Sequence, residues 1–323
     1  MSRAHWLALV LVGAAFGSSF GLNEILLSSY GPLTVSAGRV GLGALGCWAW
    51  VVATGRRPDF PAAGLVWIGA FGLFQYGAPF ALLPLAQQHV TSSVAGIANA
   101  MTPVAVVVVS LLWPGGERIT LPRFVGIALG VLGITILVTQ GAQAGGSEPL
   151  FILVAALAPV CYGVALNLVR RFHGMDPIVM TALAMTGAAC AIVPAAFAVE
   201  GAPRVPTGAE AAAFAVIGFG LTSTTFLIMY SILPKVGATN LSLVTLVAPV
   251  SATLIGAGVF GEVIGGGHLS GMALILAGLV AIDGRVWRVL SRSLRALRRS
   301  ARAVSPRPHG DAGFRPRSVI GPG

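Results

Sequence analysis

Long stretches of apolar residues without charge alternate with short polar breaks along most of this chain. Each stretch is close to the roughly 20 residues that an α-helix needs to cross the hydrocarbon core of a bilayer. The pattern predicts an all-α membrane protein whose first apolar stretch is a membrane helix and not a cleaved signal peptide. Ten transmembrane helices are expected, at residues 5–27, 32–54, 63–86, 91–113, 121–139, 149–170, 178–199, 209–233, 237–260 and 267–283.

The positions of basic residues support this count. When ten helices are threaded through the membrane, all basic loop residues except one lie on the same side. The exception is Arg204, in a loop on the opposite side. Loops rich in Lys and Arg stay in the cytoplasm, so we expect both termini inside a bacterial-type inner (plasma) membrane. The residues on the cytoplasmic side are Arg3, Arg56, Arg57, Arg118, Arg123, Arg170, Arg171 and Lys235.

Composition agrees with a membrane protein and excludes several other classes. Of the 323 residues, 56% are hydrophobic and 9% are charged, whereas roughly a quarter of the residues in a soluble protein are charged. Cys47, Cys161 and Cys190 lie in apolar runs without the spacing of metal ligands. We therefore expect neither a disulfide framework nor a metal or other cofactor.

The net charge of +10 comes mostly from the chain after residue 284. Arginines there recur at steps of three and four residues, with apolar residues between them, which predicts a basic amphipathic helix on the anionic inner leaflet. The charge therefore does not indicate binding to nucleic acid. Residues 304–323 are expected to be disordered. The arginines of the helix are Arg285, Arg288, Arg292, Arg295, Arg299 and Arg302.

The two halves of the chain resemble each other. We therefore divide the chain into a first five-helix repeat at 1–143, a second at 144–284, and a cytoplasmic tail at 285–323. Because five is odd, the second repeat enters the membrane upside down, and carriers of this kind place their substrate site between the repeats. Pairs separated by 145 residues are Pro32 and Pro177, Glu117 and Glu262, Gly126 and Gly271, and Gly133 and Gly278; Pro103 and Pro249 match with one residue of slippage.

Four segments carry a resemblance to a known family. They are "GAAFGSSFGLNEI", "PLTVSAGRVGLGAL", "TPVAVVVVSLLWPGGERI" and "LPKVGATNLSLVTLVAPVSATLIGAGVFGEVI". Over residues 5–283 the chain resembles the drug/metabolite transporter superfamily, specifically its EamA-like ten-helix members. The resemblance implies a central cavity between the halves and export of amino acids or other metabolites.

Prolines inside the predicted spans indicate where a cavity could lie. A proline leaves the carbonyl four residues earlier without its backbone donor, and such a carbonyl is tolerated at membrane depth only inside protein or beside water. The residues whose backbone carbonyl loses its donor in this way are Gln75, Asn99 and Thr245. We expect Asn99 and Thr245, which are equivalent in the repeats, to touch the substrate. The alternative is a kink whose carbonyls are capped locally.

Other polar groups inside the spans admit two interpretations. Asn23 and Asn167, with Tyr162 nearby, would either orient a substrate or form interhelical hydrogen bonds. Thr222 opens a hydroxyl patch, "TSTT", which more often bonds its own helix. Arg39 would bind a carboxylate, act in gating, or be structural; we prefer the structural role, because the resemblance implies an arginine there whatever the substrate.

Glu117 and Glu262 each end an apolar run beside a glycine. They would act either as proton-coupling carboxylates or as interfacial charges that stabilise the start of the following helix. The second interpretation is preferred, since both lie outside the apolar core. Gly126, Gly133 and Gly278 are expected at close helix contacts.

The predicted function is a secondary transporter for a small molecule, working by alternating access. A channel, a scaffold, or an intramembrane serine hydrolase are the alternatives, and a homodimer is left open. The hydrolase rests on Gly17-Ser18-Ser19-Phe20-Gly21, which matches GxSxG. It lacks a base, because the histidines (His5, His89, His173, His268 and His309) all fall in loops, ends or tails.

Overall fold

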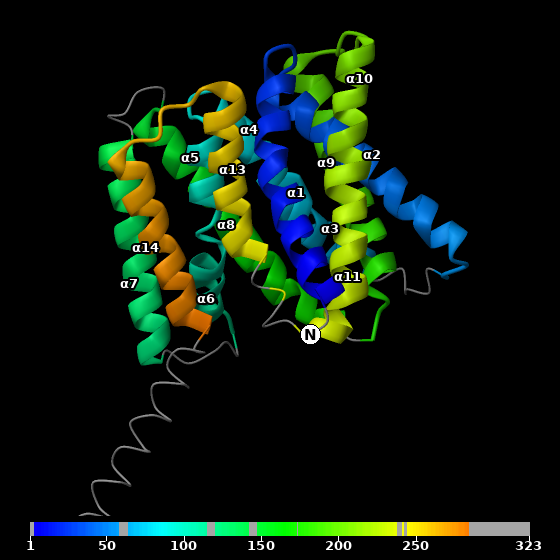
Figure 1. Ribbon diagram of the computed structural model, residues 1–323. Helices are drawn as coiled ribbons and strands as arrows, with labels where there is room; N and C mark the ends of the chain where they lie inside the picture. The colour runs from blue at the N-terminus through cyan, green and yellow to red at the C-terminus, as the bar shows by residue number, and fades with distance from the viewer. Residues whose placement is uncertain are drawn as a thin grey trace, which may run out of the picture. The chain divides into compact units, whose positions relative to one another are not determined.

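The computed structural model describes residues 3–57, 64–114, 120–141, 147–172, 174–237, 241 and 244–283 (Figure 1). Within these ranges the chain forms helices joined by loops and contains no strand. Several residues singled out above, among them Glu117, Arg118, His173 and the basic tail, lie outside the described residues.

Five helical spans make up the first half. The third, fourth and fifth spans are each interrupted, in two cases by a π-helical turn (η). The spans are α1 Arg3–Leu27; α2 Pro32–Ala53; α3 Leu65–Gly72 with η2 Leu73–Gly77 and α4 Ala78–Gln87; α5 Ser92–Asn99 with α6 Thr102–Leu112; and α7 Leu121–Ile136 with η3 Leu137–Gly141.

The second half contains five further spans, of which the third is interrupted by a long π-helical segment. They are α8 Pro149–Leu168 with η5 Val169–Arg171; α9 Pro177–Glu200; α10 Gly208–Ala215 with η6 Val216–Thr224 and α11 Thr225–Val236; α13 Val244–Phe260; and α14 Gly266–Asp283. Each of the ten predicted spans thus coincides with a helix or a run of helices. Among the described residues, nine spans are long and apolar enough to cross a membrane, and α13, at 17 residues, is a shorter apolar helix.

Local sequence explains several helix starts. Proline occupies the first turn of α2, α8 and α9, where a missing N–H costs nothing. Asp176 and Thr91 cap α9 and α5 with their side chains. Pro79 is accommodated by the widened turn of η2, in which the Ala78 N–H bonds the Leu73 carbonyl five residues earlier.

The two repeats pack through matching pairs of helices. The first helix of the first repeat, α1, packs against α13, the fourth span of the second repeat. Correspondingly, α8 packs against α5 and α6, the fourth span of the first repeat. Two further close pairs join equivalent helices, α2 with α9 and α7 with α14; the second pair lies side by side in Figure 1. This exchange is the pattern expected of two inverted five-helix repeats.

Glycines bring α7 and α14 into close contact. A Cβ placed on Gly133 would lie 2.8 Å from the Gly271 carbonyl oxygen and 3.0 Å from the Ile275 nitrogen. A Cβ on Gly278 would lie 2.7 Å from the Gly126 carbonyl oxygen. The equivalent glycines of the two repeats therefore form one interface, at which the backbones approach more closely than any side chain would allow.

We expect Gly133→Ala to destabilise the protein by about 1–3 kcal/mol, because the added methyl group forces two backbones apart. The matched control is Gly41→Ala in α2, where a Cβ meets nothing within 4 Å. Thermal unfolding in detergent or nanodiscs should show a lower midpoint for the first variant alone. Equal midpoints would contradict the close α7–α14 contact.

Candidate substrate site

Arg39 lies deep in α2, with 3% of its surface exposed. Its Nε donates to the Thr222 hydroxyl at 3.1 Å, and its guanidinium carbon lies 3.8 Å from the centre of the Phe80 ring. Arg39 and Phe80 belong to the first repeat, and Thr222 belongs to the second. The guanidinium therefore lies where the two repeats meet.

No carboxylate pairs with Arg39 among the described residues; the ion pairs found there include those of Arg56 with Asp176, His89 with Glu148 and Arg204 with Glu210. A buried cation without an anionic partner is costly in an apolar medium. One hydroxyl and one aromatic face compensate only part of that cost. The guanidinium retains donors in the fork geometry that matches a carboxylate or phosphate.

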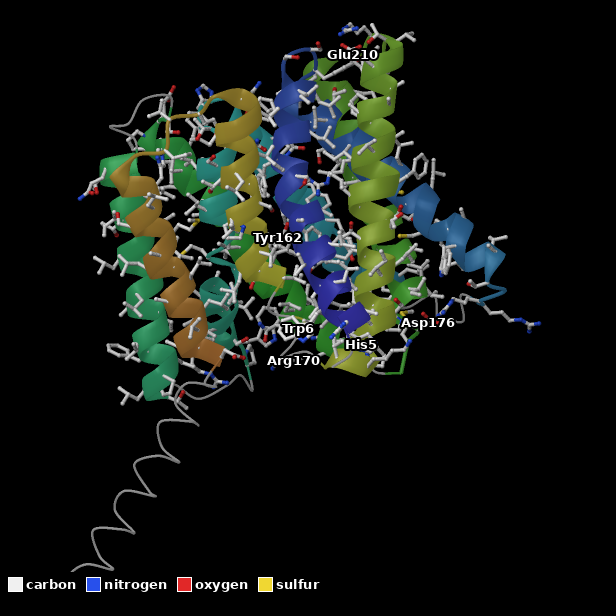
Figure 2. All side chains as sticks on the ribbon, in the orientation of Figure 1. His5, Trp6, Tyr162, Arg170, Asp176 and Glu210 are labelled. Carbon is white, nitrogen blue, oxygen red and sulfur yellow. The ribbon has the colours of Figure 1, made fainter. Side chains whose placement is uncertain are left out.

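Aromatic side chains extend from Phe80 along one side of Arg39. The Phe80 ring centre lies 6.1 Å from that of Tyr76, which in turn lies 5.1 Å from Phe226. Tyr162 of α8 lies within electrostatic range of the guanidinium. Figure 2 shows Tyr162 midway between Glu210 at one end of the structure and Arg170 and Asp176 at the other. The surroundings of Arg39 therefore combine one cation with aromatic rings and hydroxyl groups.

A π-helical segment positions Thr222. In η6, the Thr222 hydroxyl donates to the Ile217 carbonyl five residues earlier, at 2.7 Å. Thr224 and Thr225 donate in the same way to Phe219 and Gly220. The hydroxyl patch thus bonds its own helix, which is the commoner role of hydroxyls inside a helix. Thr222 differs from its neighbours because its oxygen also accepts from Arg39.

Gln75 and Asn99 each place an amide oxygen inside the protein without a hydrogen-bond partner. Gln75 lies in η2, and Asn99 ends α5 at the break before α6. The Asn99 backbone carbonyl is not free, since the Thr102 hydroxyl donates to it at 2.7 Å. The local cap that we named as the alternative is therefore present there. Thr245, in α13, is half-buried and has interaction partners of its own.

The two asparagines that repeat alignment pairs have unrelated partners. The Asn23 amide donates to Gln87 at 2.9 Å, and Gln87 donates to the Phe20 carbonyl. The Asn167 amide donates to the Ser110 hydroxyl at 3.1 Å and to the carbonyl of Gly163 at 2.9 Å. Both form the interhelical bonds of the second interpretation, and neither bonds Arg39 or Thr222.

Sequence reasoning missed Phe80, Tyr76, Gln87 and Ser110. Gln87 and Ser110 could have been found from the sequence, because both are uncharged polar residues in or beside apolar runs. We had placed Gln87 in a loop, whereas it ends α4 with 5% of its surface exposed. The aromatic residues gave no such signal, since rings are common in every membrane helix.

The hydroxyls of the GxSxG segment do not form a nucleophile site. Ser18 donates to Ala14 and Ser19 to Phe16, both within α1. Two histidines of the described chain are engaged elsewhere, His268 with the Gly265 N–H and His89 with Glu148. Among the described residues, the hydrogen bonds of Ser18 and Ser19 go to backbone carbonyls and not to a side-chain base, which activation of a serine requires.

Two of the hollows that open at the surface of the described chain are large, and neither is lined by Arg39 or Thr222. An apolar groove of about 500 Å³ lies between α2, α9 and α10, with Tyr30 and Arg204 at its rim. A polar cavity of about 480 Å³ lies at the ends of α1 and α4, lined by Glu24, Gln87 and Thr91 among others. In the loop at the groove's rim, a hydrogen bond to Glu210 raises the pKa of the Arg204 guanidinium above its ordinary value.

Comparison with known families identifies the architecture. The model of the EamA-like transporter family matches residues 4–139 and 149–282, one five-helix repeat in each range. The chain belongs to the EamA-like transporter family. It is thus a multi-pass membrane transporter and not an enzyme, and the hydrolase alternative is excluded.

Individual relatives of this EamA-like transporter are distant. A protein of Streptantibioticus cattleyicolor, named a probable terminal-alkyne amino-acid exporter, is 28% identical over 185 residues, 54% of this chain and 59% of that relative's length. An Archaeoglobus fulgidus protein named an uncharacterized transporter is 23% identical over 283 residues, 86% of this chain and 98% of the relative. A solved crystal structure superposes with a TM-score of 0.62 at 22% identity, over 91% of this chain and 99% of the other. That similarity shows the fold.

We expect Asn167→Leu to lower stability by about 1–2 kcal/mol, because it leaves the buried Ser110 hydroxyl without its partner. Restoring an apolar pair with Ser110→Ala in the same chain should recover most of the loss. Unfolding in nanodiscs measures both effects. A single variant as stable as the parent would show that this pair contributes nothing.

Proposed function

We propose that this EamA-like transporter is a secondary exporter of amino acids or other small carboxylate-bearing metabolites, working by alternating access. The observation that carries the proposal is Arg39, a buried guanidinium at the meeting of the two repeats without a carboxylate among the described residues. The missing anion is the reason that we now favour a carboxylate-binding role over the structural role preferred from the sequence. A substrate carboxylate would supply the missing anion.

The surrounding groups suit an amino acid. A zwitterion needs donors for its carboxylate and acceptors for its ammonium group. Arg39 supplies donors, and the buried, unpartnered amide oxygens of Gln75 and Asn99 are candidate acceptors. Aromatic rings beside Arg39 would receive an apolar side chain. The name of the S. cattleyicolor relative, an amino-acid exporter, agrees with this substrate class.

Alternating access is supported by the origin of these groups. Arg39 comes from the first repeat and Thr222 from the second, so a rocking motion of the halves would change both contacts at once. A channel would not need a polar contact between the two halves at the centre. We retain Asn23, Tyr162, Asn167 and Thr245 as candidate neighbours of the substrate path.

The proposed setting is a bacterial inner membrane with both termini in the cytoplasm. The charge distribution supports it, because Arg56, Arg170 and Lys235 lie at or near helix ends. Threading ten helices puts these ends on one side of the membrane. The basic tail would bind anionic lipid there.

We expect Arg39→Leu to abolish counterflow of amino acids in proteoliposomes, with at least about a tenfold loss of rate, because the substrate carboxylate loses its charged donor. Arg39→Lys should retain part of the activity, since it keeps the charge without the forked geometry. Arg57→Leu, at an exposed loop residue, is the matched control. A mixture of labelled amino acids serves as the probe. Unchanged counterflow in Arg39→Leu would remove Arg39 from the site.

Alkaline phosphatase fused after Arg171 should be inactive, and the same enzyme fused after Arg204 should be active. Phosphatase folds only outside the cytoplasm, and the basic loops are expected inside. Activity measured in whole cells, with fusion levels compared by immunoblot, tests the orientation. An active fusion after Arg171 would reverse it.

A further inference from the structure

Glu262 follows α13 and is folded back on the helix that precedes it. Gly261 ends the helix with a φ of +66°, a conformation that glycine adopts without strain. The Glu262 N–H then bonds the Gly256 carbonyl at 3.0 Å. The Gly-Glu pair therefore sets the local geometry: Gly261 allows the chain to turn, and the turn directs the Glu262 side chain back along α13.

The carboxylate of Glu262 binds the start of α5, a helix of the other repeat. It accepts from the Ser92 N–H at 2.8 Å, from the Ser92 hydroxyl at 2.6 Å and from the Ser93 N–H at 3.0 Å. The positive end of the α5 dipole adds to this attraction. We had expected Glu262 to stabilise the following helix, α14; the structure corrects this, since the charge caps α5 across the repeats.

The space for this carboxylate depends on Gly256. A Cβ at that position would overlap both Glu262 Oε2 and Ser93 Oγ. Two residues later, a Cβ on Gly258 would meet nothing within 4 Å. The close fit at Gly256 holds the carboxylate against α5.

The contact between α2 and α9 differs, because polar bonds join the two helices at both ends. At one end Glu200 accepts from the Leu33 and Thr34 N–H groups, each at 2.8 Å. At the other end Arg56 pairs with Asp176. This pair of helices is therefore a fixed unit, whereas α5 is a half-helix whose far end stops at the Asn99 break.

A polar cavity lies directly beside the Glu262 contact. Thr91, the N-cap of α5, lines the cavity, together with Glu24 and Gln87. Glu24 is also within electrostatic range of Glu262, and one of its carboxylate oxygens is buried without a partner. The start of α5 therefore borders a hollow that reaches the surface.

We propose that Glu262 is the latch of the extracytoplasmic gate, holding α5 closed over the substrate path and releasing it when the transporter opens outward. The proposal rests on the transport function proposed above. It assigns Glu262 a positioning role: the residue acts through α5, and the far end of α5 carries Asn99.

Side-specific cysteine labelling tests the latch without knowledge of the substrate. The full-length protein, with its three native cysteines replaced by alanine, carries Asn99→Cys as the reporter. A membrane-impermeant maleimide is added to right-side-out or to inverted vesicles, and the two labelling rates are compared. Glu262→Gln and, separately, Gly256→Ala break the latch. Glu200→Gln, which weakens the fixed pair, and Gly258→Ala are the matched controls.

We expect the ratio of outer to inner labelling rates to rise about tenfold in Glu262→Gln and Gly256→Ala and to stay at the parent value in both controls. If neither variant inserts, Ser92→Ala, which removes a single donor to the carboxylate, should raise the ratio in the same direction. A merely structural cap would lower thermal stability without favouring one side.

An unchanged ratio, or a reporter that stays inert from the outer side after the latch is broken, overturns the proposal. Amino-acid counterflow, measured in parallel on the protein that keeps Asn99 and Glu262, separates the two hypotheses. Absent counterflow with a shifted ratio would refute the exporter and leave the latch, whereas normal counterflow with an unchanged ratio would refute the latch alone.

Discussion

Hydrogen bonding inside an apolar solvent is the constraint on which this structure depends. With no water in the hydrocarbon, a polar group must find a partner within the protein or face a cavity. The Thr102 hydroxyl satisfies the Asn99 carbonyl that Pro103 deprives of its donor, and the widened turn of η2 accommodates Pro79. Asn167 pairs with Ser110 for the same reason. Against this background of pairing, the exceptions are informative. They include the amide oxygens of Gln75 and Asn99, which are buried without a partner, and Arg39, which has no carboxylate beside it among the described residues.

The hydrophobic pattern was sufficient to predict the helices and their order. A membrane span needs a run of apolar residues, so its position can be read directly from the sequence. The repeat was likewise visible, since matched glycines such as Gly133 and Gly278 are constrained by the same close contact of α7 with α14. What the pattern does not contain is the internal form of a span. Nothing in it distinguished the π-helical η6 from an ordinary helix, although the Thr222 bond to Ile217 depends on that widened turn.

Contacts across the repeats were harder to predict, because repeat alignment gives equivalence and not proximity. Asn23 and Asn167 align, yet one bonds Gln87 and the other Ser110. Glu262 was read with its sequence neighbour α14, whereas its carboxylate reaches α5, about 170 residues earlier. Arg39 was recognised as buried, but its partners Phe80 and Thr222 come from two different spans. Such pairings follow from how the helices cross, and the order of residues along the chain does not record that crossing.

The exchange of partners between repeats has a consequence for synthesis. The helix α1 packs mainly on α13, which begins at Val244, more than two hundred residues after α1 ends at Leu27. At a ribosomal rate of about 5–20 residues per second, α1 remains in the membrane for roughly ten seconds or longer before that surface exists. During this interval its buried face, including Gly17 and Asn23, meets lipid or the insertion machinery. Neither half can therefore complete its core alone, and maturation of the protein must wait for the last helices to be inserted.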